Sequence, residues 1–364
     1  MNWRYGMPTK VIGGRGCIRN ESALMSGLGK KALIVTGRRS AKDCGALDDL
    51  TTAFSGMDIS WILFDQVEPN PSIATIRTAA LIASDECVDF VVGIGGGSPL
   101  DAAKAIAVAT VNEVDDTALF KGSWKNAPLP IVAIPTTSGT GSEVTPYAIL
   151  TDNKVHSKRN LSSPSLFPRL AYLDPSYTDN LPRHVTIHTA VDALSHALEG
   201  LMSNRSTPMT DILAREALGI LGTELRALDH HPGPESRDRL MYASMLAGMV
   251  IAHTGTTALH AMGYSLTYFK DIDHGRANGL LMPAYLAFVA ETHPKQVQDA
   301  LDAMGFSDLQ ALARTLSDLL GERETLSEQE KADFAAIASR ALNLPNTLRL
   351  PSEADLAAIY NQMA

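Results

Sequence analysis

Cysteine, basic residues and long apolar runs are all scarce in this chain of 364 residues. The three cysteines, Cys17, Cys44 and Cys87, lie far apart and form no Cys-x-x-Cys pair. This spacing indicates neither a disulfide framework nor a thiolate metal site. It fits a reducing compartment, so we expect a cytoplasmic protein.

The chain is acidic: it has 31 Lys and Arg residues and 40 Asp and Glu residues, which gives a formal net charge of -9. An acidic chain without a basic patch is a poor partner for nucleic acid or for an anionic membrane surface. No stretch approaches the ~20 apolar residues that a membrane span needs, and residues 1–16 lack the apolar core of a signal peptide. We therefore expect a small-molecule partner, and neither nucleic acid nor a membrane.

The first half of the chain alternates continuous apolar stretches with helical segments. The apolar stretches are residues 31–36, 60–64, 88–94 and 130–134. Such alternation predicts a parallel sheet covered by helices on both faces. Residues 1–180 are therefore expected to form an α/β dinucleotide-binding domain, entered through a small glycine-rich ribbon within residues 1–30.

From Leu181 onward the pattern predicts helices only, and Pro182 marks the change. The longest helical segments are expected at residues 186–203, 207–228, 236–268 and 276–292. Residues 181–364 are therefore predicted to form an all-α domain.

Two polar, glycine-rich loops follow the third and fourth apolar stretches. In the first, Gly95-Gly96-Gly97 precedes Ser98, the expected N-cap of a helix over residues 99–109. Close backbone approach and free helix N-terminal amides favour a bound pyrophosphate. A tight turn without a ligand is the alternative, since the spacing is not Gly-x-Gly-x-x-Gly. The second loop, residues 135–145, adds threonine and serine hydroxyls at the same predicted sheet edge.

Four residues of the second half suggest a metal site. Asp192 and His196 are spaced i, i+4 in an unbroken helical stretch, which puts both side chains on one face. A simple hydrogen bond between them is the alternative reading. With His260 and His274 added, three imidazoles and one carboxylate suit Fe²⁺, Zn²⁺, Ni²⁺ or Co²⁺ better than Ca²⁺ or Mg²⁺.

Together, in this order, the motifs resemble the iron-containing, or group III, alcohol dehydrogenases over essentially the whole chain. The motifs are Gly95-Gly-Gly-Ser-Pro-Leu-Asp101, Pro135-Thr-Thr-Ser-Gly-Thr-Gly-Ser-Glu143, Asp192-Ala-Leu-Ser-His-Ala-Leu-Glu199, His260-Ala-Met and His274-Gly-x-Ala-Asn278. The resemblance implies a dehydroquinate synthase-like fold, an active-site cleft between the two domains and a homodimer.

The resemblance also implies the site residues. The family's metal ligands match Asp192, His196, His260 and His274 one for one. The family's cofactor contacts fall on Asn70, Gly96, Gly97, Ser98, Asp101, Thr136, Thr137, Thr140, Thr145 and Lys158.

One departure from the family pattern concerns the cofactor. Many NAD-dependent relatives have an aspartate where this chain has Gly37, which is followed by Arg38, Arg39 and Ser40. Loss of the carboxylate and gain of arginines favour a 2′-phosphate, so we expect NADP(H) rather than NAD(H). The alternative is that the arginines are ordinary solvated side chains.

A second departure concerns the substrate pocket. Tyr264 stands where most relatives keep a histidine beside the metal, and His253 where asparagine is usual. His253 precedes His260 by seven residues, which would put both on one helical face. We expect Tyr264 or His253 to handle the alcohol proton or to bind a polar group of the substrate. Two packed side chains with satisfied hydrogen bonds are the alternative.

The activity that the resemblance implies is reversible hydride transfer between NAD(P)(H) and a small alcohol or aldehyde. A divalent metal, Fe²⁺ before Zn²⁺ or Ni²⁺, would act as Lewis acid on the substrate oxygen. The alternatives are a dehydroquinate synthase-like lyase, a glycerol(-phosphate) dehydrogenase-like enzyme on the same fold, and a non-catalytic nucleotide-binding protein.

Overall fold

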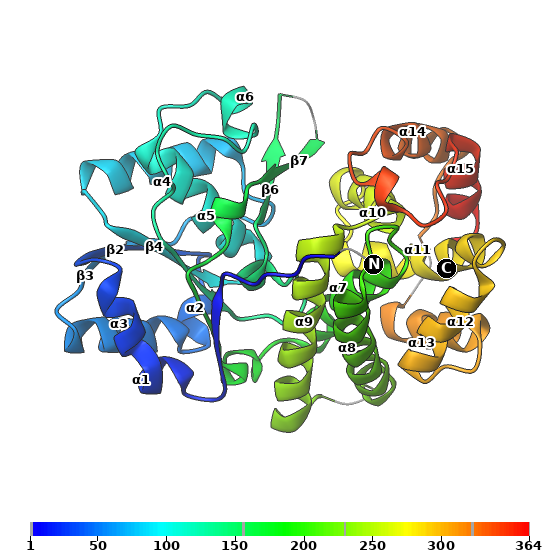
Figure 1. Ribbon diagram of the computed structural model, residues 1–364, viewed down its shortest axis with the longest axis horizontal. Coiled ribbons are helices and arrows are strands. Elements are labelled where there is room, and N and C mark those ends of the chain that lie inside the picture. Colours follow the sequence, from blue (N-terminus) through cyan, green and yellow to red (C-terminus); the bar gives the residue numbers. More distant parts are fainter. Residues whose placement is uncertain (1–2, 155–156, 229–230, 322–323, 364) are drawn as a thin grey trace. The chain divides into compact units, whose positions relative to one another are not determined.

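The computed structural model describes residues 3–154, 157–228, 231–321 and 324–363. It contains two compact units (Figure 1). The α/β unit comprises Gly6–Thr137 and Gly141–Leu181. The helical unit begins at Pro182 and also includes Ser138–Thr140 and residues 3–5. Among the described residues, no helix combines the length and the apolar character needed to cross a membrane.

The α/β unit is built on a six-stranded sheet in which all neighbouring strands run parallel. The strand order is β1 (Lys10–Gly13), β8 (Leu170–Leu173), β5 (Ile131–Pro135), β4 (Phe90–Gly95), β2 (Lys31–Thr36) and β3 (Ser60–Phe64). The four predicted apolar stretches form β2 to β5, and the parallel sheet is confirmed. The interior strands read as apolar runs because both of their faces are covered.

Alternate residues of each strand point to opposite faces of the sheet. Leu33 and Val35 pack against α4 (Ile73–Asp85) and α5 (Gly97–Val111), whereas Ala32 and Ile34 pack on the other face. Figure 1 shows α4 and α5 above the sheet, with α1 (Cys17–Glu21) and α3 (Ala46–Gly56) below it. A short helix, α2 (Ser40–Asp43), precedes α3. A further short helix, α6 (Asp116–Leu119), and an antiparallel hairpin of β6 (Tyr147–Asp152) and β7 (Ser157–Ser162) complete the unit.

The ribbon expected within residues 1–30 is wrong. β1 joins the sheet beside β8, and the following residues form α1 and a 3₁₀ helix over Ser22–Gly27. Lys10 pairs with Leu170, a partner that lies 160 residues away, so no local pattern could identify it.

The helical unit follows the predicted order with one correction. Its helices are α7 (Arg183–Leu201), α8 (Pro208–Ala227), α9 (Pro234–Thr254), α10 (Ala258–Phe269), α11 (His274–Ala290), α12 (Pro294–Met304), α13 (Leu309–Leu320), α14 (Glu328–Ala338) and α15 (Glu353–Asn361). The single helix expected over residues 236–268 is wrong, because the chain leaves the helix at Gly255, whose φ is +67°. α7 lies at the centre of the unit and packs against α8, α9 and α11.

Candidate functional site

At the centre of the helical unit, one helix has several polar and charged side chains that are buried. Asp192, His196 and Glu199 of α7 are all buried, although charged and polar groups lose hydration there. Their spacing of four and then three residues puts them on one face of α7. Such a face requires polar partners from the helices packed against it.

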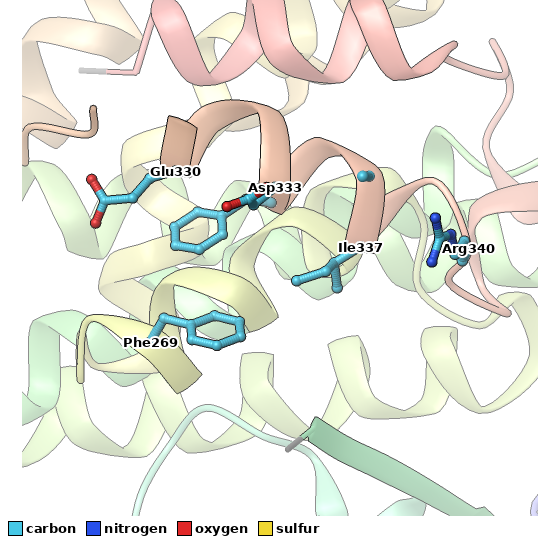
Figure 2. A pocket seen from close by; sticks show the side chains of 7 residues that line it. Phe269, Glu330, Asp333, Ile337 and Arg340 are labelled. Atoms are coloured by element: carbon cyan, nitrogen blue, oxygen red, sulfur yellow. The ribbon is translucent and has the colours of Figure 1, made fainter. Parts of the chain in front are cut away.

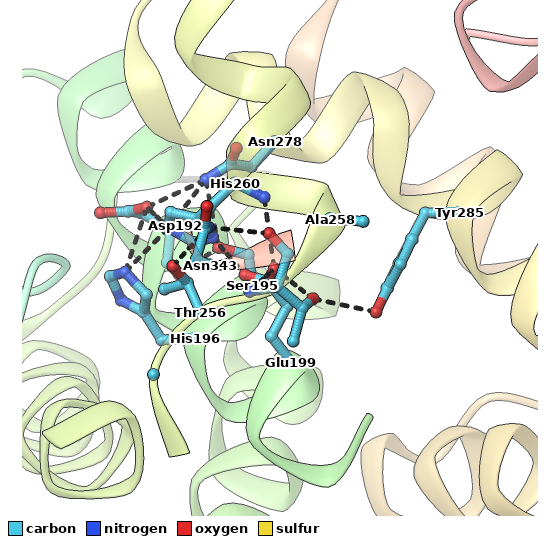
Figure 3. Close-up of polar contacts among 12 residues, drawn as sticks. Asp192, Ser195, His196, Glu199, Thr256, Ala258, His260, Asn278, Tyr285 and Asn343 are labelled. Atoms are coloured by element: carbon cyan, nitrogen blue, oxygen red, sulfur yellow. Dashed lines mark hydrogen bonds and ion pairs between the residues drawn. The ribbon is translucent and has the colours of Figure 1, made fainter. Parts of the chain in front are cut away.

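The structure brings the four predicted metal ligands together on α7, α10 and the first residue of α11. Figure 3 shows Asp192, His196 and His260 of this group. The Nε2 atoms of His260, His274 and His196 lie 3.7, 3.8 and 3.9 Å from Oδ1 of Asp192. The ligating atoms of Asp192, His260 and His274 all lie within 4.8 Å of one another. His196 joins this trio, since its Nε2 is 3.0 Å from Nε2 of His260.

The electrostatics of the cluster favour a cation at its centre. Burial alone would raise the pKa of Asp192, but His196 and His274 outweigh it and hold that pKa well below its usual range. Burial lowers the pKa of His196. Burial would also lower the pKa of His260, but the carboxylates of Glu199 and Asp192 raise it to about 9. Several lone pairs thus converge on one point, and a proton or a borderline divalent ion relieves their repulsion.

Two further polar residues, Asn278 and Glu199, contact the predicted ligands. Asn278 places Nδ2 3.4 Å from Oδ1 of Asp192 and 3.2 Å from Nε2 of His260, while its own Oδ1 is buried without a hydrogen-bond partner among the described residues. Glu199 contacts the imidazole of His260 through Nδ1. The same kind of local signal marks both residues, since Glu199 follows His196 by three residues on α7 and Asn278 follows His274 by four on α11.

Tyr264 and His253 occupy different surroundings. The ring of Tyr264 stacks on His274, with centroids 5.4 Å apart, and meets His260 edge-on at 6.2 Å. His253 lies near the end of α9 and stacks on Tyr5, with centroids 4.3 Å apart. The expected common helical face of His253 and His260 is wrong, because the two residues lie on different helices.

The predicted phosphate loops lie at the carboxyl ends of adjacent strands. β4 lies between β2 and β5, and the strand order reverses between β2 and β4, which is where ligands of such sheets bind. Thr136 donates its backbone N–H to the carbonyl of Gly95, 2.9 Å away, so the two loops are in contact. Oγ1 of Thr136 is buried with no hydrogen-bond partner in the described part of the chain. An orphaned hydroxyl beside a glycine turn fits a polar ligand.

The start of α5 differs from the prediction in one respect. The helix begins at Gly97 with Gly96 as its N-cap, so the expected N-cap role of Ser98 is wrong. Oγ of Ser98 instead accepts a hydrogen bond from the backbone N–H of Asn70, 3.1 Å away. Asn70 has a φ of +56°, in the left-handed region that asparagine tolerates better than most residues.

Asp101 serves an internal network. Its Oδ1 accepts from Oγ of Ser142 at 2.6 Å and its Oδ2 from the backbone N–H of Ile149 at 2.8 Å. The buried Lys104 donates to Oγ of Ser142 at 2.7 Å and to the carbonyl of Tyr147 at 2.6 Å. This network ties α5 to the second loop and to β6, and a direct contact of Asp101 with a cofactor stays a prediction.

The remaining predicted cofactor residues are distributed over several elements. Oγ1 of the buried Thr145 lies 3.4 Å from Nζ of Lys104, and Thr137 would contact any side chain placed at Gly96. Lys158 pairs in β7 with Thr151, whose hydroxyl donates to the carbonyl of Asn70.

Thr140 belongs instead to the short segment Ser138–Thr140, which is part of the helical unit. In that segment the carbonyl of Gly139 lies 3.3 Å from Nδ1 of His196. Thr140 is therefore the one predicted cofactor residue outside the α/β unit.

The segment expected to select the dinucleotide follows β2. Gly37 directly follows the last residue of the strand, and Arg38, Arg39 and Ser40 are exposed. Arg39 makes an ion pair with Asp43 at 3.5 Å, a contact between two solvated side chains that costs little to break. Both guanidinium groups are therefore accessible to a ligand.

The helical unit also holds a surface pocket of about 640 Å³ between the end of α10 and α14 (Figure 2). Its lining residues are Phe269, Glu330, Asp333, Phe334, Ala336, Ile337 and Arg340. None of them belongs to the candidate metal cluster or to the predicted cofactor residues, so this pocket is separate from both.

Comparison with known proteins covers both units. Residues 8–175 match the family described as iron-containing alcohol dehydrogenase, and residues 186–364 match the C-terminal part of the Fe-containing alcohol dehydrogenase family. The 1,3-propanediol dehydrogenase of Citrobacter freundii is 34% identical over 355 residues, which are 92% of this chain and 91% of that protein.

Two further proteins extend the comparison. The NADPH-dependent butanol dehydrogenase of Clostridium saccharobutylicum is 31% identical over 79% of this chain and 74% of its own length. The crystal structure of the iron-containing alcohol dehydrogenase of Thermotoga maritima is 41% identical, covers 99% of each chain and superposes with a TM-score of 0.93.

Proposed function

Because the chain belongs to the family of iron-containing alcohol dehydrogenases, we propose that it interconverts a small alcohol and its aldehyde by hydride transfer with NADP(H). The observation that carries the proposal is the convergence of Asp192, His196, His260 and His274 on one point. These four residues would hold a divalent cation, which supplies Lewis-acid stabilisation of the negative charge that develops on the substrate oxygen. Iron is the proposed ion, with Zn²⁺ or Ni²⁺ as substitutes for the same donor set.

The chain's own residues would bind and orient the two reactants. The glycine turn at residues 95–97 and the amides that open α5 offer N–H donors for a pyrophosphate. The orphaned hydroxyl of Thr136 offers a further polar contact. Holding the nicotinamide in one orientation lowers the entropic part of the barrier to hydride transfer.

The preference for NADP(H) rests on the segment after β2. A 2′-phosphate carries charge that the exposed guanidinium groups of Arg38 and Arg39 can bind through charge-assisted hydrogen bonds. Gly37 adds no carboxylate that would repel this phosphate. The relative from Clostridium saccharobutylicum is named for NADPH, which agrees with this preference.

Tyr264 is the better supported of the two residues proposed to handle the alcohol proton. Its ring lies against the imidazoles of His260 and His274, two of the proposed metal ligands, and we propose that its hydroxyl reaches the substrate oxygen. His253 stacks on Tyr5 and is proposed to contact a polar group of the substrate. Two relatives are named for 1,3-propanediol and butanol, and a short aldehyde with a polar end is the proposed substrate class.

The decisive experiment loads the metal-free protein separately with Fe²⁺, Zn²⁺ and Ni²⁺ and offers a panel of short aldehydes with NADPH or NADH. We expect oxidation of NADPH that depends on aldehyde and metal, and a loss of at least about 100-fold in kcat/KM in Asp192→Asn. If NADPH binds but no aldehyde is reduced in any metal-loaded form, the lyase and nucleotide-binding alternatives replace this proposal.

A further inference from the structure

Glu199 is a completely buried carboxylate beside the candidate metal cluster, and its side-chain hydrogen bonds within the described residues are with α10 or with the residue before it. Oε1 accepts hydrogen bonds from the backbone N–H of Thr257 at 2.7 Å, from Oγ1 of Thr257 at 2.6 Å and from the backbone N–H of His260 at 3.2 Å. Oε2 contacts Nδ1 of His260. A buried carboxylate is costly unless its lone pairs are satisfied, and here both oxygens are engaged.

The first consequence of these contacts concerns the N-terminus of α10, where backbone N–H groups need acceptors. Thr257 is the N-cap of α10, yet its own side chain caps no backbone N–H. The first turn of a helix leaves N–H groups without partners inside the helix, and a negative charge there is favourable. Glu199 supplies both the acceptor and the charge from another helix, which fixes where α10 begins and where His260 lies on it.

A second consequence concerns the imidazole of His260. An ionised carboxylate only accepts hydrogen bonds, so the contact with Glu199 puts the proton of a neutral His260 on Nδ1. Nε2 is then the lone-pair nitrogen, and it lies 3.0 Å from Nε2 of His196 and 3.7 Å from Oδ1 of Asp192. The imidazole is held in the orientation and the tautomer that a metal ligand requires.

The residues that carry these contacts are held in turn by the C-terminal part of the chain (Figure 3). Nδ2 of Asn343 donates to Oγ1 of Thr256 at 3.0 Å and to the carbonyl of Thr257 at 2.9 Å. Oγ1 of Thr257 also lies 3.0 Å from the hydroxyl of Tyr285. The connection between α9 and α10 is therefore held by hydrogen bonds on several sides, and these bonds would break if it moved away from Glu199.

We propose that Glu199 is a positioning residue of the metal centre, which sets the affinity for the divalent ion by holding His260 with Nε2 toward the other ligands. The inference rests on the metal centre of the proposed function and is independent of the substrate and of the nicotinamide cofactor. A purely structural role would lower the stability of the protein without changing the affinity of the folded state for metal.

The test compares Glu199→Gln with Glu224→Gln in the full-length, metal-free protein. Glu224 is a matched control because it is also a buried carboxylate, but it contacts Arg239 and Ser236 instead of a metal-binding residue. The affinity for Zn²⁺ is measured by competition with a chelator of known affinity, and Tm is recorded for each variant. We expect the Kd for Zn²⁺ to rise about 10- to 100-fold in Glu199→Gln and to stay within about 2-fold of the wild type in Glu224→Gln.

A measurement on the unmutated protein keeps the inference testable if Glu199→Gln fails to fold. Long-range ¹H–¹⁵N correlation spectra of the ¹⁵N-histidine-labelled, Zn²⁺-loaded protein report which nitrogen of His260 carries the proton. We expect the proton on Nδ1. A proton on Nε2, or an unchanged Kd in folded Glu199→Gln, overturns the role of Glu199.

The result also separates this inference from the proposed function. If the wild type binds no Zn²⁺, the metal centre itself is refuted and the role of Glu199 falls with it. Tight binding that weakens in Glu199→Gln supports the positioning role even where no aldehyde is reduced, in which case the dehydrogenase proposal alone fails.

Discussion

At the scale of single residues, a buried ionisable group keeps its charge only where neighbouring groups stabilise that charge. Asp192 is held ionised by the histidines around it, whereas Glu143, in the second glycine-rich loop, has its pKa raised to about 7 by burial. The same burial lowers the pKa of Lys104 to about 8. Carboxylates of the same chemical type thus behave in opposite ways, according to the number of cationic or hydrogen-bonding neighbours that each has.

Replacing Glu143 by glutamine should change how stability depends on pH. Because the folded state raises the pKa of Glu143 from 4.5 to about 7, it holds the proton more tightly than the unfolded state does. The cost of burying the ionised carboxylate is therefore absent below about pH 4.5, grows as the pH rises toward 7 and stays constant above that. We expect Glu143→Gln to gain on the order of 3 kcal/mol relative to the wild type between pH 5 and pH 8.

Urea unfolding at both pH values measures this difference. The exposed Glu113 provides the control, since Glu113→Gln should shift stability equally at pH 5 and pH 8. A difference between Glu143→Gln and the wild type that does not change with pH would contradict the raised pKa of Glu143.

Tyr264→Phe separates the packing of this ring from the chemistry of its hydroxyl. The phenylalanine ring keeps the stacking on His274, so affinity for metal should remain that of the wild type. If the hydroxyl assists proton transfer, kcat should fall about 10²-fold or more and the pH profile of kcat/KM should change. The parallel variant His253→Phe should raise KM more than it lowers kcat. Wild-type kinetics in both variants would assign the two residues to packing.

At the scale of secondary-structure elements, the proposed preference for NADP(H) depends on a short connection at the end of a strand. The connection after β2 presents Arg38 and Arg39 to solvent. In the double variant Arg38→Ala/Arg39→Ala, the ratio of kcat/KM for NADPH to that for NADH should fall about 10- to 100-fold, because charge-assisted hydrogen bonds to the 2′-phosphate are lost. Steady-state kinetics with both dinucleotides measure the ratio.

Lys42 provides a matched control for this preference. It is a cation close to the two arginines in the sequence, and it forms an ion pair with Asp65 at 2.8 Å. Lys42→Ala should leave the ratio unchanged. A ratio that falls equally in Lys42→Ala and in the double arginine variant would point to a general charge effect instead of a contact with the 2′-phosphate.

The attachment of α5 to β6 depends on the buried ammonium group of Lys104. Lys104→Met fills a similar volume but leaves the carbonyl of Tyr147 and the carboxylate of Asp101 without their cationic donor. We expect the free energy of unfolding to fall by about 3 kcal/mol, since removing one partner of a buried charged network costs more than the network contributes net. Chemical denaturation measures the loss, and the surface variant Lys42→Met should cost less than about 1 kcal/mol. Equal losses in the two variants would contradict this account.

At the scale of the whole molecule, the proposed metal ligands come from three helices of the helical unit, namely α7, α10 and α11. A ligand that binds only the folded state stabilises it by mass action. Adding Zn²⁺ to the chelator-treated protein at about 100 times its Kd should raise the stability of this unit by about 2.7 kcal/mol. Thermal unfolding with and without Zn²⁺ measures the effect, which should be much smaller in Asp192→Asn. An unchanged Tm in the wild type would argue against a common site for the four residues.

The sequence by itself determined the features that are set over a few neighbouring residues. Apolar stretches predicted the strands β2 to β5, and the spacing of Asp192 and His196 predicted that both side chains lie on one helical face. The resemblance to the family added His260 and His274 as further predicted ligands, and the structure places them beside the first two. These features are readable because periodicity and strand burial depend on residues that are close together along the chain.

Only the tertiary structure decided the contacts between distant parts. The pairing of β1 with β8 joins residues 160 positions apart, and the end of α9 at Gly255 is accompanied by hydrogen bonds from Asn343 to the following residues. Glu199 acquires its role only where α10 begins beside α7. Local propensity cannot encode such contacts, because a buried carboxylate or a helix end is stable only with partners that packing brings from elsewhere in the chain.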